Sequence, residues 1–192
     1  MKVQINKHEL EYSGFIKIEK SRLRFEKFNG TMSEEVTRYR HYRGDAVAVI
    51  IFDNVCNQVL LIKQFRYAVH ARTSNGWLVE CVAGMQEKEE NLEDVAHREV
   101  YEETGLKLTS LNLMTEYFFS PGSCSDKVYI FLGTVENPEQ TTEIHGLSHE
   151  GEDIKVWWVP LVTALAMCDA SEIQDAKTIV GLNLLARRIQ IN

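Results

Sequence analysis

Short apolar runs, separated by polar turn-forming residues, follow one another along most of the chain. β-branched and aromatic residues dominate these runs, and their length is that of strands rather than helices. The pattern predicts six strands, at Ala46–Phe52, Gln58–Lys63, Trp77–Val82, Leu113–Phe119, Val128–Val135 and Ile154–Val159. The polar loop Glu136–Asp153, of about 18 residues, is longer than compact domains usually carry without a use for it.

Two helices are predicted after the last strand. Pro160 suits the start of a helix, because its fixed φ fits and its missing N–H is not needed there. Asp175–Arg188 carries apolar residues at helical spacing, so we expect this second helix to pack on the sheet.

The N-terminal part differs, because charged residues interrupt its alternating pattern. The segments Arg22–Phe28 and Thr31–Tyr42 are broken at Asn29-Gly30, the dipeptide that best fits a type I′ hairpin turn. We therefore predict a β-hairpin here. A two-stranded ribbon is marginal alone in water, so this hairpin must dock on another surface.

The segment Leu92–Thr104 is predicted to be a helix with well-marked ends. Asn91 can cap its N-terminus, and Glu93 and Asp94 lie in the first turn, where the helix dipole favours anions. Gly105 stands where a left-handed residue commonly ends a helix.

Carboxylates occupy the inward side of this helix. At about 100° per residue, the apolar stripe that begins with Leu92, Val95 and Ala96 continues at Glu99 and Glu103, with Glu102 beside them. A solvated charged helix would place its glutamates opposite the apolar residues. Partly buried like charges are costly unless a cation compensates them, and a hard divalent ion, Mg²⁺ or Mn²⁺, suits oxygen ligands.

Arg98 and Lys88 are the only Lys or Arg residues between Glu87 and Glu103, a window that holds eight of the 28 acidic residues. Arg98 can pair on the helix surface with Asp94 or Glu102. Alternatively, it reaches back to Glu90 and fixes the loop before the helix. The spacing does not decide between these two arrangements.

Composition and charge limit the remaining possibilities. The chain has 192 residues, of which 44% are hydrophobic, which is enough for a sizeable core. Its net charge of −7 argues against a general nucleic-acid binder. The longest apolar run, Ala46–Phe52, is too short to span a bilayer, and residues 1–14 lack a signal-peptide pattern. We therefore expect a soluble cytoplasmic protein that does not bind a membrane.

The segment from Gly84 to Leu106 resembles the 23-residue box of the Nudix hydrolases, GX5EX7REUXEEXGU, where U is aliphatic. All nine defining positions match: Gly84, Glu90, Arg98, Glu99, Val100, Glu102, Glu103, Gly105 and Leu106. The resemblance implies an α/β fold, with an α/β/α sandwich around a mixed sheet. It also implies that the box forms a loop–helix–loop that presents carboxylates to Mg²⁺, with Mn²⁺ possible.

The chain is most similar to the ADP-ribose pyrophosphatase branch of this family, over roughly residues 14–188. The motifs that carry the likeness are Phe28-Asn-Gly-Thr-Met-Ser, Arg43-Gly44, Gln64-Phe65-Arg66, Val82-Ala83-Gly84-Met85, Ser120-Pro121-Gly122, His145-Gly146-Leu147 and Glu150-Gly151-Glu152-Asp153-Ile154. In that branch a small N-terminal antiparallel sheet docks on a second subunit. The similarity therefore implies a homodimer, with residues 1–43 as the dimerisation region and residues 44–192 as the Nudix hydrolase domain.

The resemblance also implies roles for individual residues. Glu99 and Glu103 correspond to the main metal ligands, the Ala83 carbonyl to a backbone ligand, and Glu152 to an additional ligand. Glu102 corresponds to a supporting catalytic carboxylate, and Glu150 to the general base.

Five further residues correspond to substrate contacts. Arg66 and Arg43 match diphosphate or terminal-ribose contacts, Met85 a wall of that pocket, and Phe28 an aromatic that stacks on the base. Asp126 stands where the branch usually has a glutamate that hydrogen-bonds the sugar, and Ser123 replaces its second glycine. Both departures concern recognition of the terminal ribose.

The activity that the resemblance implies is Mg²⁺-dependent hydrolysis of a nucleoside diphosphate sugar, here ADP-ribose to AMP and ribose 5-phosphate. GDP-mannose or another nucleoside diphosphate sugar is the first alternative, because the box contacts only the diphosphate and the metal. A nucleotide-sensing module without turnover is disfavoured, because the box carboxylates are all present. The acidic balance also disfavours an RNA cap hydrolase.

Overall fold

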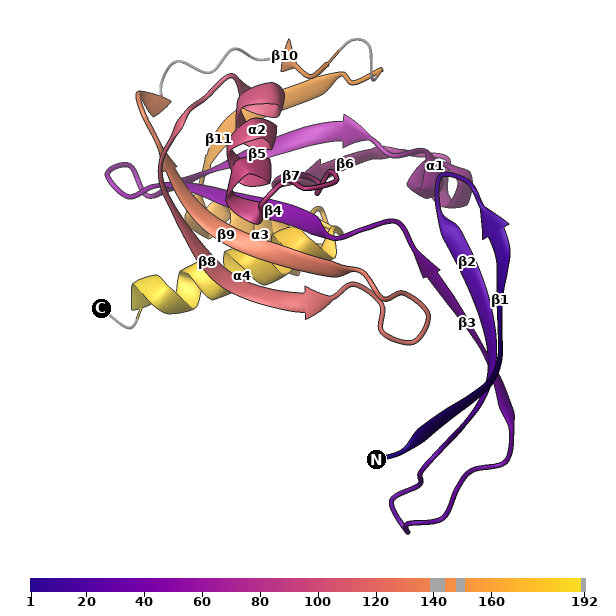
Figure 1. Ribbon diagram of the computed structural model, residues 1–192. Helices are drawn as coiled ribbons and strands as arrows, with labels where there is room; N and C mark the ends of the chain where they lie inside the picture. The colour runs from indigo at the N-terminus through magenta and orange to yellow at the C-terminus, as the bar shows by residue number, and fades with distance from the viewer. Residues whose placement is uncertain (139–143, 148–150, 191–192) are drawn as a thin grey trace. The chain divides into compact units, whose positions relative to one another are not determined.

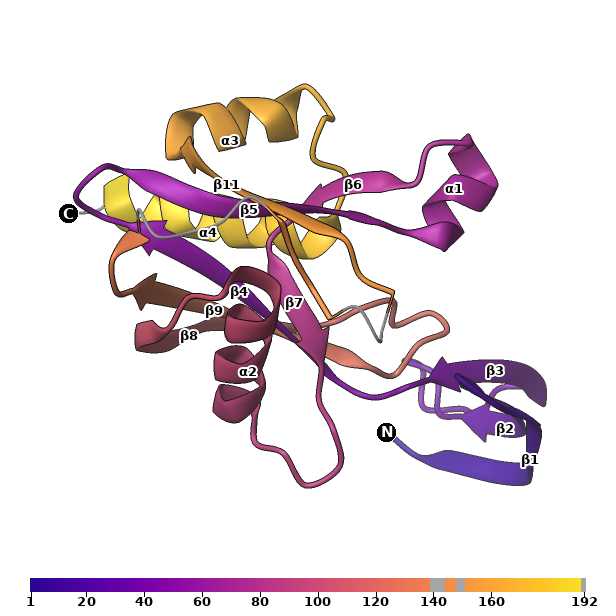
Figure 2. The ribbon, with the colours of Figure 1, turned by 90° about the horizontal axis from the view of Figure 1, so that it is seen from above.

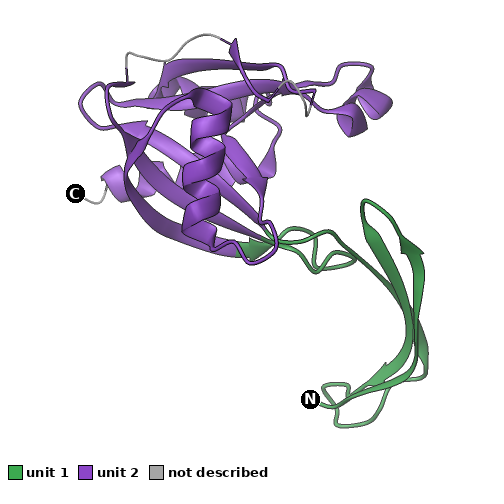
Figure 3. Cartoon of the chain, turned by 45° about the horizontal axis from the view of Figure 1, so that its top comes forward, with its two compact units in different colours: residues 1–45, 117–127 green, residues 46–116, 128–192 purple. Residues whose placement is uncertain are grey.

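The computed structural model describes residues 1–138, 144–147 and 151–190, and the chain forms two compact units (Figures 1 and 3). Unit 1 comprises residues 1–45 and 117–127, and unit 2 comprises residues 46–116 and 128–192. Each unit is described by itself below. The assignment of residues 1–43 to dimerisation and of 44–192 to hydrolysis stays a prediction.

Unit 1 contains the small N-terminal antiparallel sheet that was expected. Its three strands are β1 (Val3–Ser13), β2 (Lys17–Phe25) and β3 (Val36–Tyr42), in the order β1-β2-β3. The β2–β3 pairing runs from Leu23 opposite Val36 to Lys17 opposite Tyr42. Strand β1 was not predicted from the sequence. All but one of its residues are exposed, so it has no buried face to impose an alternating apolar pattern.

The turn predicted at Asn29-Gly30 is of a different type. A type I′ turn needs a positive φ at both central residues, but of these two residues only Gly30 has one, at 78°. The Gly30 N–H donates to the Lys27 carbonyl at 2.9 Å, and Glu26 forms a bridge with Met32. This is the geometry of a three-residue hairpin loop that ends in a left-handed glycine.

Unit 2 is built on an eight-stranded mixed sheet with the order β10-β11-β5-β4-β9-β8, in which β6 also pairs with β5 and β7 with β4. The strands are β4 (Ala46–Asp53), β5 (Gln58–Phe65), β6 (Trp77–Glu80), β7 (Val82–Met85), β8 (Leu108–Phe118), β9 (Lys127–Val135), β10 (Ile144–His145) and β11 (Ile154–Pro160). Strands β4 and β9 are parallel, which makes the sheet mixed. Five of the six predicted strands are present as single strands.

The segment predicted as one strand at Trp77–Val82 is divided between two. Its first part, β6, pairs with β5, and its second part, β7, pairs with β4. The change of partner falls at Cys81, a residue that is fully buried. Periodicity does not reveal such a change, because both halves are apolar.

Helices cover both faces of this sheet (Figures 1 and 2). The helices are α1 (Tyr67–Thr73), α2 (Leu92–Thr104), α3 (Leu161–Asp169) and α4 (Ala176–Gln190). Helix α2 lies on one face and α3 and α4 lie on the other, which gives the expected α/β/α sandwich. The short α1 was not predicted. Each of its residues is exposed or half-buried, so it leaves no amphipathic signal.

Alternation along β4 assigns its residues to the two faces. Val47, Val49 and Ile51 join one apolar cluster with Val95, Ala96 and Val100 of α2. Ile50 lies on the opposite face, where a Cβ on Gly181 of α4 would stand only 2.5 Å from it. The central strand is therefore buried on both sides, which is why it forms the longest apolar run of the chain.

Candidate active site

Helix α2 has the predicted ends and the predicted orientation. The Asn91 side chain accepts a hydrogen bond from the Asp94 N–H at 2.8 Å, and Gly105 ends the helix with a φ of 70°. Glu103 is only 2% exposed, as its place on the apolar stripe predicts. The side chain of Glu99 is 14% exposed and that of Glu102 is 28% exposed. The helix therefore carries its carboxylates toward the sheet.

Strand β7 brings backbone groups against two of these carboxylates. The Ala83 N–H donates to Oε2 of Glu103 at 3.2 Å. Next to it, Gly84 leaves the room that the Glu99 carboxylate occupies, because a Cβ at that position would lie 1.7 Å from Oε1 of Glu99. Any other residue at position 84 would displace this carboxylate. The invariant first position of the box pattern thus has a steric reason in this chain.

Arg98 makes both of the contacts that the sequence left open. Its Nε and one terminal nitrogen donate to Glu90 at 2.9 and 3.0 Å, and its other terminal nitrogen donates to Glu99 at 2.7 Å and to Glu102 at 3.2 Å. It also donates to the Met85 carbonyl at 3.2 Å. The hydrogen bonds from Arg98 lower the pKa of Glu90. One arginine therefore ties the loop before α2 to the carboxylates on it.

The carboxylates of this cluster differ in how their environment shifts their pKa. Burial raises the pKa of Glu103 well above its ordinary value, and the nearby charges of Glu99 and Glu152 raise it further. Burial also raises the pKa of Glu99, to which Glu102 and Glu152 contribute, although Arg98 opposes the shift. A cation placed among these groups would relieve both burial and mutual repulsion.

Glu152 is the predicted loop ligand that falls within the described residues. Its carboxylate accepts a hydrogen bond from the Leu147 N–H at 3.1 Å, and its own N–H donates to the Leu147 carbonyl at 3.3 Å. Gly146 and Gly151, the neighbours of Leu147 and Glu152 in sequence, both have a positive φ. Glu150, the predicted base, lies outside the described residues.

The carboxylate cluster fits a divalent metal ion in its chemistry. Its members offer hard oxygen donors, and burial makes their charges costly without a cation. Within the described ranges, no three His, Cys, Asp or Glu side chains already stand in metal-ligating geometry. Arg98 and the Leu147 N–H engage oxygens of Glu99, Glu102 and Glu152, and an ion would compete with them for these oxygens.

Arg66 directly follows β5, and its charge interacts with that of Glu103. Its guanidinium donates two hydrogen bonds to Glu80, at 2.8 and 2.9 Å, and 40% of its side chain is exposed. The positive charge of Arg66 lowers the pKa of Glu103 and so partly offsets the effect of burial. Unit 2 thus brings together Arg66, Met85 and the predicted metal ligands. The pairing of Arg66 with Glu80 had no signal in the sequence, because 14 residues and a helix separate the two.

The other predicted substrate contacts belong to unit 1, where two of them meet. The Asp126 carboxylate accepts hydrogen bonds from the N–H groups of Arg43, at 2.8 Å, and Gly44, at 3.3 Å. The Arg43 guanidinium carbon stands 3.9 Å from the centroid of the Phe15 ring, a cation–π contact. In this structure Asp126 therefore fixes the backbone that carries Arg43.

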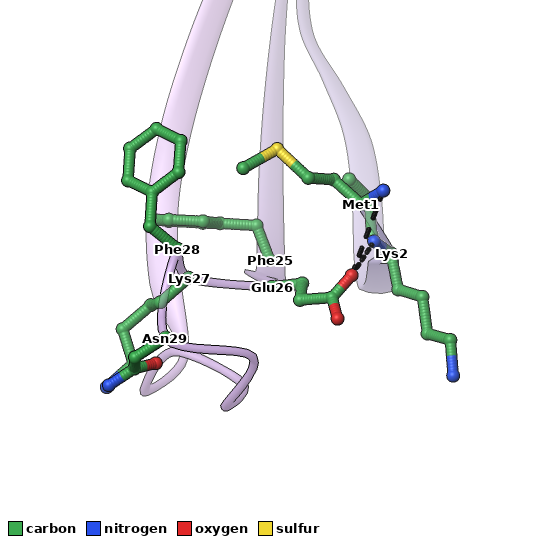
Figure 4. Close-up of a pocket in the computed structure, with 8 residues that line it drawn as sticks. Met1, Lys2, Phe25, Glu26, Lys27, Phe28 and Asn29 are labelled. Carbon is green, nitrogen blue, oxygen red and sulfur yellow. Dashed lines mark hydrogen bonds and ion pairs between the residues drawn. The ribbon is translucent and has the colours of Figure 1, made fainter.

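Phe28 is 99% exposed at the tip of the N-terminal sheet, where it lines an open pocket of about 650 Å³ (Figure 4). The pocket walls include Phe25 and Met1, and its lining is mostly apolar. The Glu26 carboxylate closes one side by accepting a hydrogen bond from the Lys2 N–H at 2.9 Å. An aromatic ring so exposed is available to stack on a planar group.

Comparisons with known proteins place this chain in a family. A family model described as the NUDIX domain matches residues 42–179. The chain is 38% identical to the ADP-ribose pyrophosphatase of Escherichia coli strain K12 over 183 residues, which cover 95% of this chain and 87% of that protein. It is 34% identical to the ADP-ribose pyrophosphatase of Haemophilus influenzae over 186 residues, or 95% and 85% of the two chains.

Two further proteins are similar to the chain at lower sequence identity. A GDP-mannose pyrophosphatase of Citrobacter koseri is 32% identical over 144 residues, which cover 74% of each chain. A crystal structure of an ADP compounds hydrolase superposes with a TM-score of 0.77 at 18% identity, and covers 99% of this chain and 95% of that one. The chain belongs to the Nudix family, whose hydrolases generally depend on a divalent metal ion. Among the described helices, none combines the length and apolar character needed to cross a membrane.

The raised pKa values lead to a prediction on metal binding and pH. Adding a divalent cation is expected to raise the Tm more at about pH 8 than at about pH 6, because Glu103 and Glu99 must lose their protons to bind it. Without metal, the pH dependence of stability has the opposite sign. A carboxyl whose pKa is higher in the folded state contributes stability at acidic pH, and this contribution is lost as the pH rises through that pKa. Thermal unfolding scans with and without the cation measure both effects. A metal-induced shift that is equal at the two pH values would contradict this placement of the metal.

Proposed function

We propose that the chain hydrolyses the diphosphate link of ADP-ribose to give AMP and ribose 5-phosphate, with Mg²⁺ as the metal ion. The observation that carries this proposal is the set of box carboxylates that α2 and β7 bring together, with Arg66 beside it. The two ADP-ribose pyrophosphatases cover 95% of the chain, whereas the GDP-mannose pyrophosphatase covers 74%. This difference favours ADP-ribose over GDP-mannose.

The residues of unit 2 would have separate roles in metal binding and in binding of the diphosphate. Glu99, Glu103 and Glu152, with the Ala83 carbonyl, would hold Mg²⁺. The bound ion would supply positive charge to the diphosphate and make a water molecule more acidic. Arg66 would orient the diphosphate through hydrogen bonds from its exposed edge. Arg98 would keep Glu99 and Glu102 in place, so that binding does not require the side chains to be ordered first.

The loop between β9 and β11 supplies the proposed base. We assign proton abstraction from the attacking water to Glu150, two residues before the proposed ligand Glu152. Phosphoryl transfer depends mainly on positioning and charge stabilisation, so the base is expected to act only when the diphosphate is bound. Met85 would form a wall of the substrate pocket. Phe28, Arg43 and Asp126 would contact the substrate, at its nucleotide base and its terminal ribose.

A substrate panel tests this proposal. With Mg²⁺, kcat/KM for ADP-ribose is expected to exceed that for GDP-mannose, UDP-glucose, diadenosine polyphosphates and NADH. Chromatography should detect AMP and ribose 5-phosphate in equal amounts. A higher kcat/KM for GDP-mannose would identify GDP-mannose as the preferred substrate and leave the class of reaction unchanged. No turnover of any member would leave the nucleotide-sensing module as the better description.

We further propose that the chain is a homodimer in which a second copy covers the N-terminal sheet. Several large apolar side chains of this sheet and of the turn between β1 and β2 are more than half exposed: Val3, Ile5, Leu10, Tyr12, Phe15 and Tyr39. An exposed apolar surface of this kind is typical of an interface.

The dimer proposal predicts the effect of two charges on β1. Sedimentation velocity should show a dimer for the wild type and a monomer for the double variant Ile5→Asp/Leu10→Asp. In a monomeric protein these exposed positions would tolerate the change with little effect on the state of association. Gln4→Asp adds a charge to an exposed residue of the same strand and serves as control. A monomeric wild type would refute the dimer.

A further inference from the structure

A buried network of charged side chains connects the N-terminus of α4 with Arg66. Its centre is Glu80, which is 1% exposed and accepts two hydrogen bonds from Arg66. Lys177 donates to the same carboxylate at 2.5 Å, and also to Asp175 at 2.9 Å. Two cations therefore share one buried carboxylate. None of the roles described above involves Lys177.

The first turn of α4 holds Lys177 in place. Asp175 caps the helix, because its Oδ2 accepts hydrogen bonds from the Thr178 N–H at 3.0 Å and from the Thr178 hydroxyl at 2.6 Å. The Thr178 hydroxyl in turn accepts a hydrogen bond from the Cys81 N–H at 2.7 Å. Thr178 is fully buried, and Cys81 is the residue at which the strand changes partner from β5 to β4. The helix end is thus fixed to the strand segment that carries Glu80.

The charges of this network remain in place at neutral pH. Burial alone would raise the pKa of Glu80, but Arg66 and Lys177 outweigh it and lower that pKa. Burial would also lower the pKa of Lys177, but Glu80 and Asp175 raise it. Glu80 is therefore an anion with a cation on each side. Its negative charge is shared, so it does not fully neutralise Arg66.

The two cations differ in their access to a ligand. The side chain of Arg66 is 40% exposed, whereas that of Lys177 is 16% exposed. Arg66 is also close enough to Glu103 for their charges to interact. The contacts of Lys177 therefore connect it to a ligand at the carboxylate cluster through Glu80 and Arg66.

We propose that Lys177 is a positioning residue for diphosphate binding: by sharing the Glu80 carboxylate it limits the pull of that carboxylate on Arg66 and leaves the exposed guanidinium edge for the substrate. The inference rests on the proposed function in one respect, namely that Arg66 contacts a diphosphate. It assigns to the C-terminal helix, on the face of the sheet opposite α2, a part in substrate binding.

The variant Lys177→Met separates this role from a purely structural one. In its absence Arg66 becomes the sole cation on Glu80, so the guanidinium is drawn to that carboxylate and holds a diphosphate less well. We expect KM for ADP-ribose to rise by about tenfold while kcat changes by less than about threefold. Ile173→Val is the matched control, because it removes one methyl group from a fully buried residue two positions before Asp175. A KM in Lys177→Met that matches the control would overturn the proposal.

A double-mutant cycle tests whether Lys177 acts through Glu80. In a Glu80→Gln background the shared carboxylate is already lost, so adding Lys177→Met should change KM by less than about twofold. A full tenfold rise in that background would show that Lys177 acts by another route, and would overturn the proposal. The comparison needs only the two variants that lack the buried anion, so it can still overturn the proposal if Lys177→Met alone fails to fold.

Pyrophosphate binding distinguishes failure of this inference from failure of the proposed function. If the wild type turns over no member of the substrate panel, the proposed function fails, and calorimetry with inorganic pyrophosphate and Mg²⁺ then decides the role of Lys177. The Kd for pyrophosphate should be about tenfold higher in Lys177→Met than in Ile173→Val. Equal affinities in these two variants would overturn the inference.

Discussion

Replacing Glu103 by glutamine is expected to lower kcat by about two orders of magnitude or more, equivalent to about 3 kcal/mol of transition-state stabilisation. Glu103 is the most buried carboxylate of α2, and the variant removes one charge from the proposed metal site. Glutamine keeps the shape of the side chain and an oxygen that can accept the hydrogen bond from the Ala83 N–H. Steady-state kinetics with ADP-ribose at saturating Mg²⁺ measure the effect.

Two observations keep this loss of activity separate from unfolding. The metal-free variant should unfold at a Tm no lower than that of the wild type, because burial opposes the charge of Glu103 and the change removes that charge. Glu93→Gln makes the same chemical change at an exposed position in the first turn of α2 and should retain activity. Glu103→Gln with wild-type kcat would refute the assignment of this residue to the metal.

The second large effect is expected at the loop glutamates, whose proposed roles predict different kinetics. If Glu150 is the base, Glu150→Gln should lower kcat by about two orders of magnitude with little change in KM, and added metal should not restore it. If Glu152 is a ligand, Glu152→Gln should raise the Mg²⁺ concentration needed for the half-maximal rate, and saturating metal should restore part of the activity.

Titration of Mg²⁺ against kcat for both variants decides between these roles. The structure supports a ligand role for Glu152, because its charge raises the pKa of both Glu99 and Glu103 and so must lie near them. If each variant shows the behaviour expected of the other, Glu150 is the metal ligand and Glu152 is the base. Wild-type behaviour of both variants would remove the loop from the mechanism and leave Glu102 as the next candidate for the base.

The sequence predicted helix α2 and most of the sheet because their signals are local. Asn91 and Gly105 mark the ends of α2 through their own caps, and the carboxylates follow from a spacing within one helix. The buried strands have apolar runs because the helices cover both faces of the sheet. Strand β1 and helix α1 lack buried faces, and for this reason the pattern did not reveal them.

Other contacts of the proposed functional residues, within each unit, connect distant parts of the chain. Lys177 and Glu80 are 97 positions apart, and Asp126 and the Arg43 N–H are 83 positions apart. Such pairs depend on which strands become neighbours, and a single sequence does not encode that choice in any local pattern. The two alternatives for Arg98 were undecidable for a related reason, since its several N–H groups satisfy both at once.

The most direct test of this account is product analysis of ADP-ribose incubated with Mg²⁺ and either the wild type or Glu103→Gln. The central claim is that the carboxylates of α2, held by Arg98 and β7, bind the metal ion that makes diphosphate hydrolysis possible. We predict equal amounts of AMP and ribose 5-phosphate from the wild type, no products when the metal is chelated, and a rate at least about a hundredfold lower with Glu103→Gln. Equal rates of product formation by the two proteins, or turnover that persists without metal, would contradict the claim.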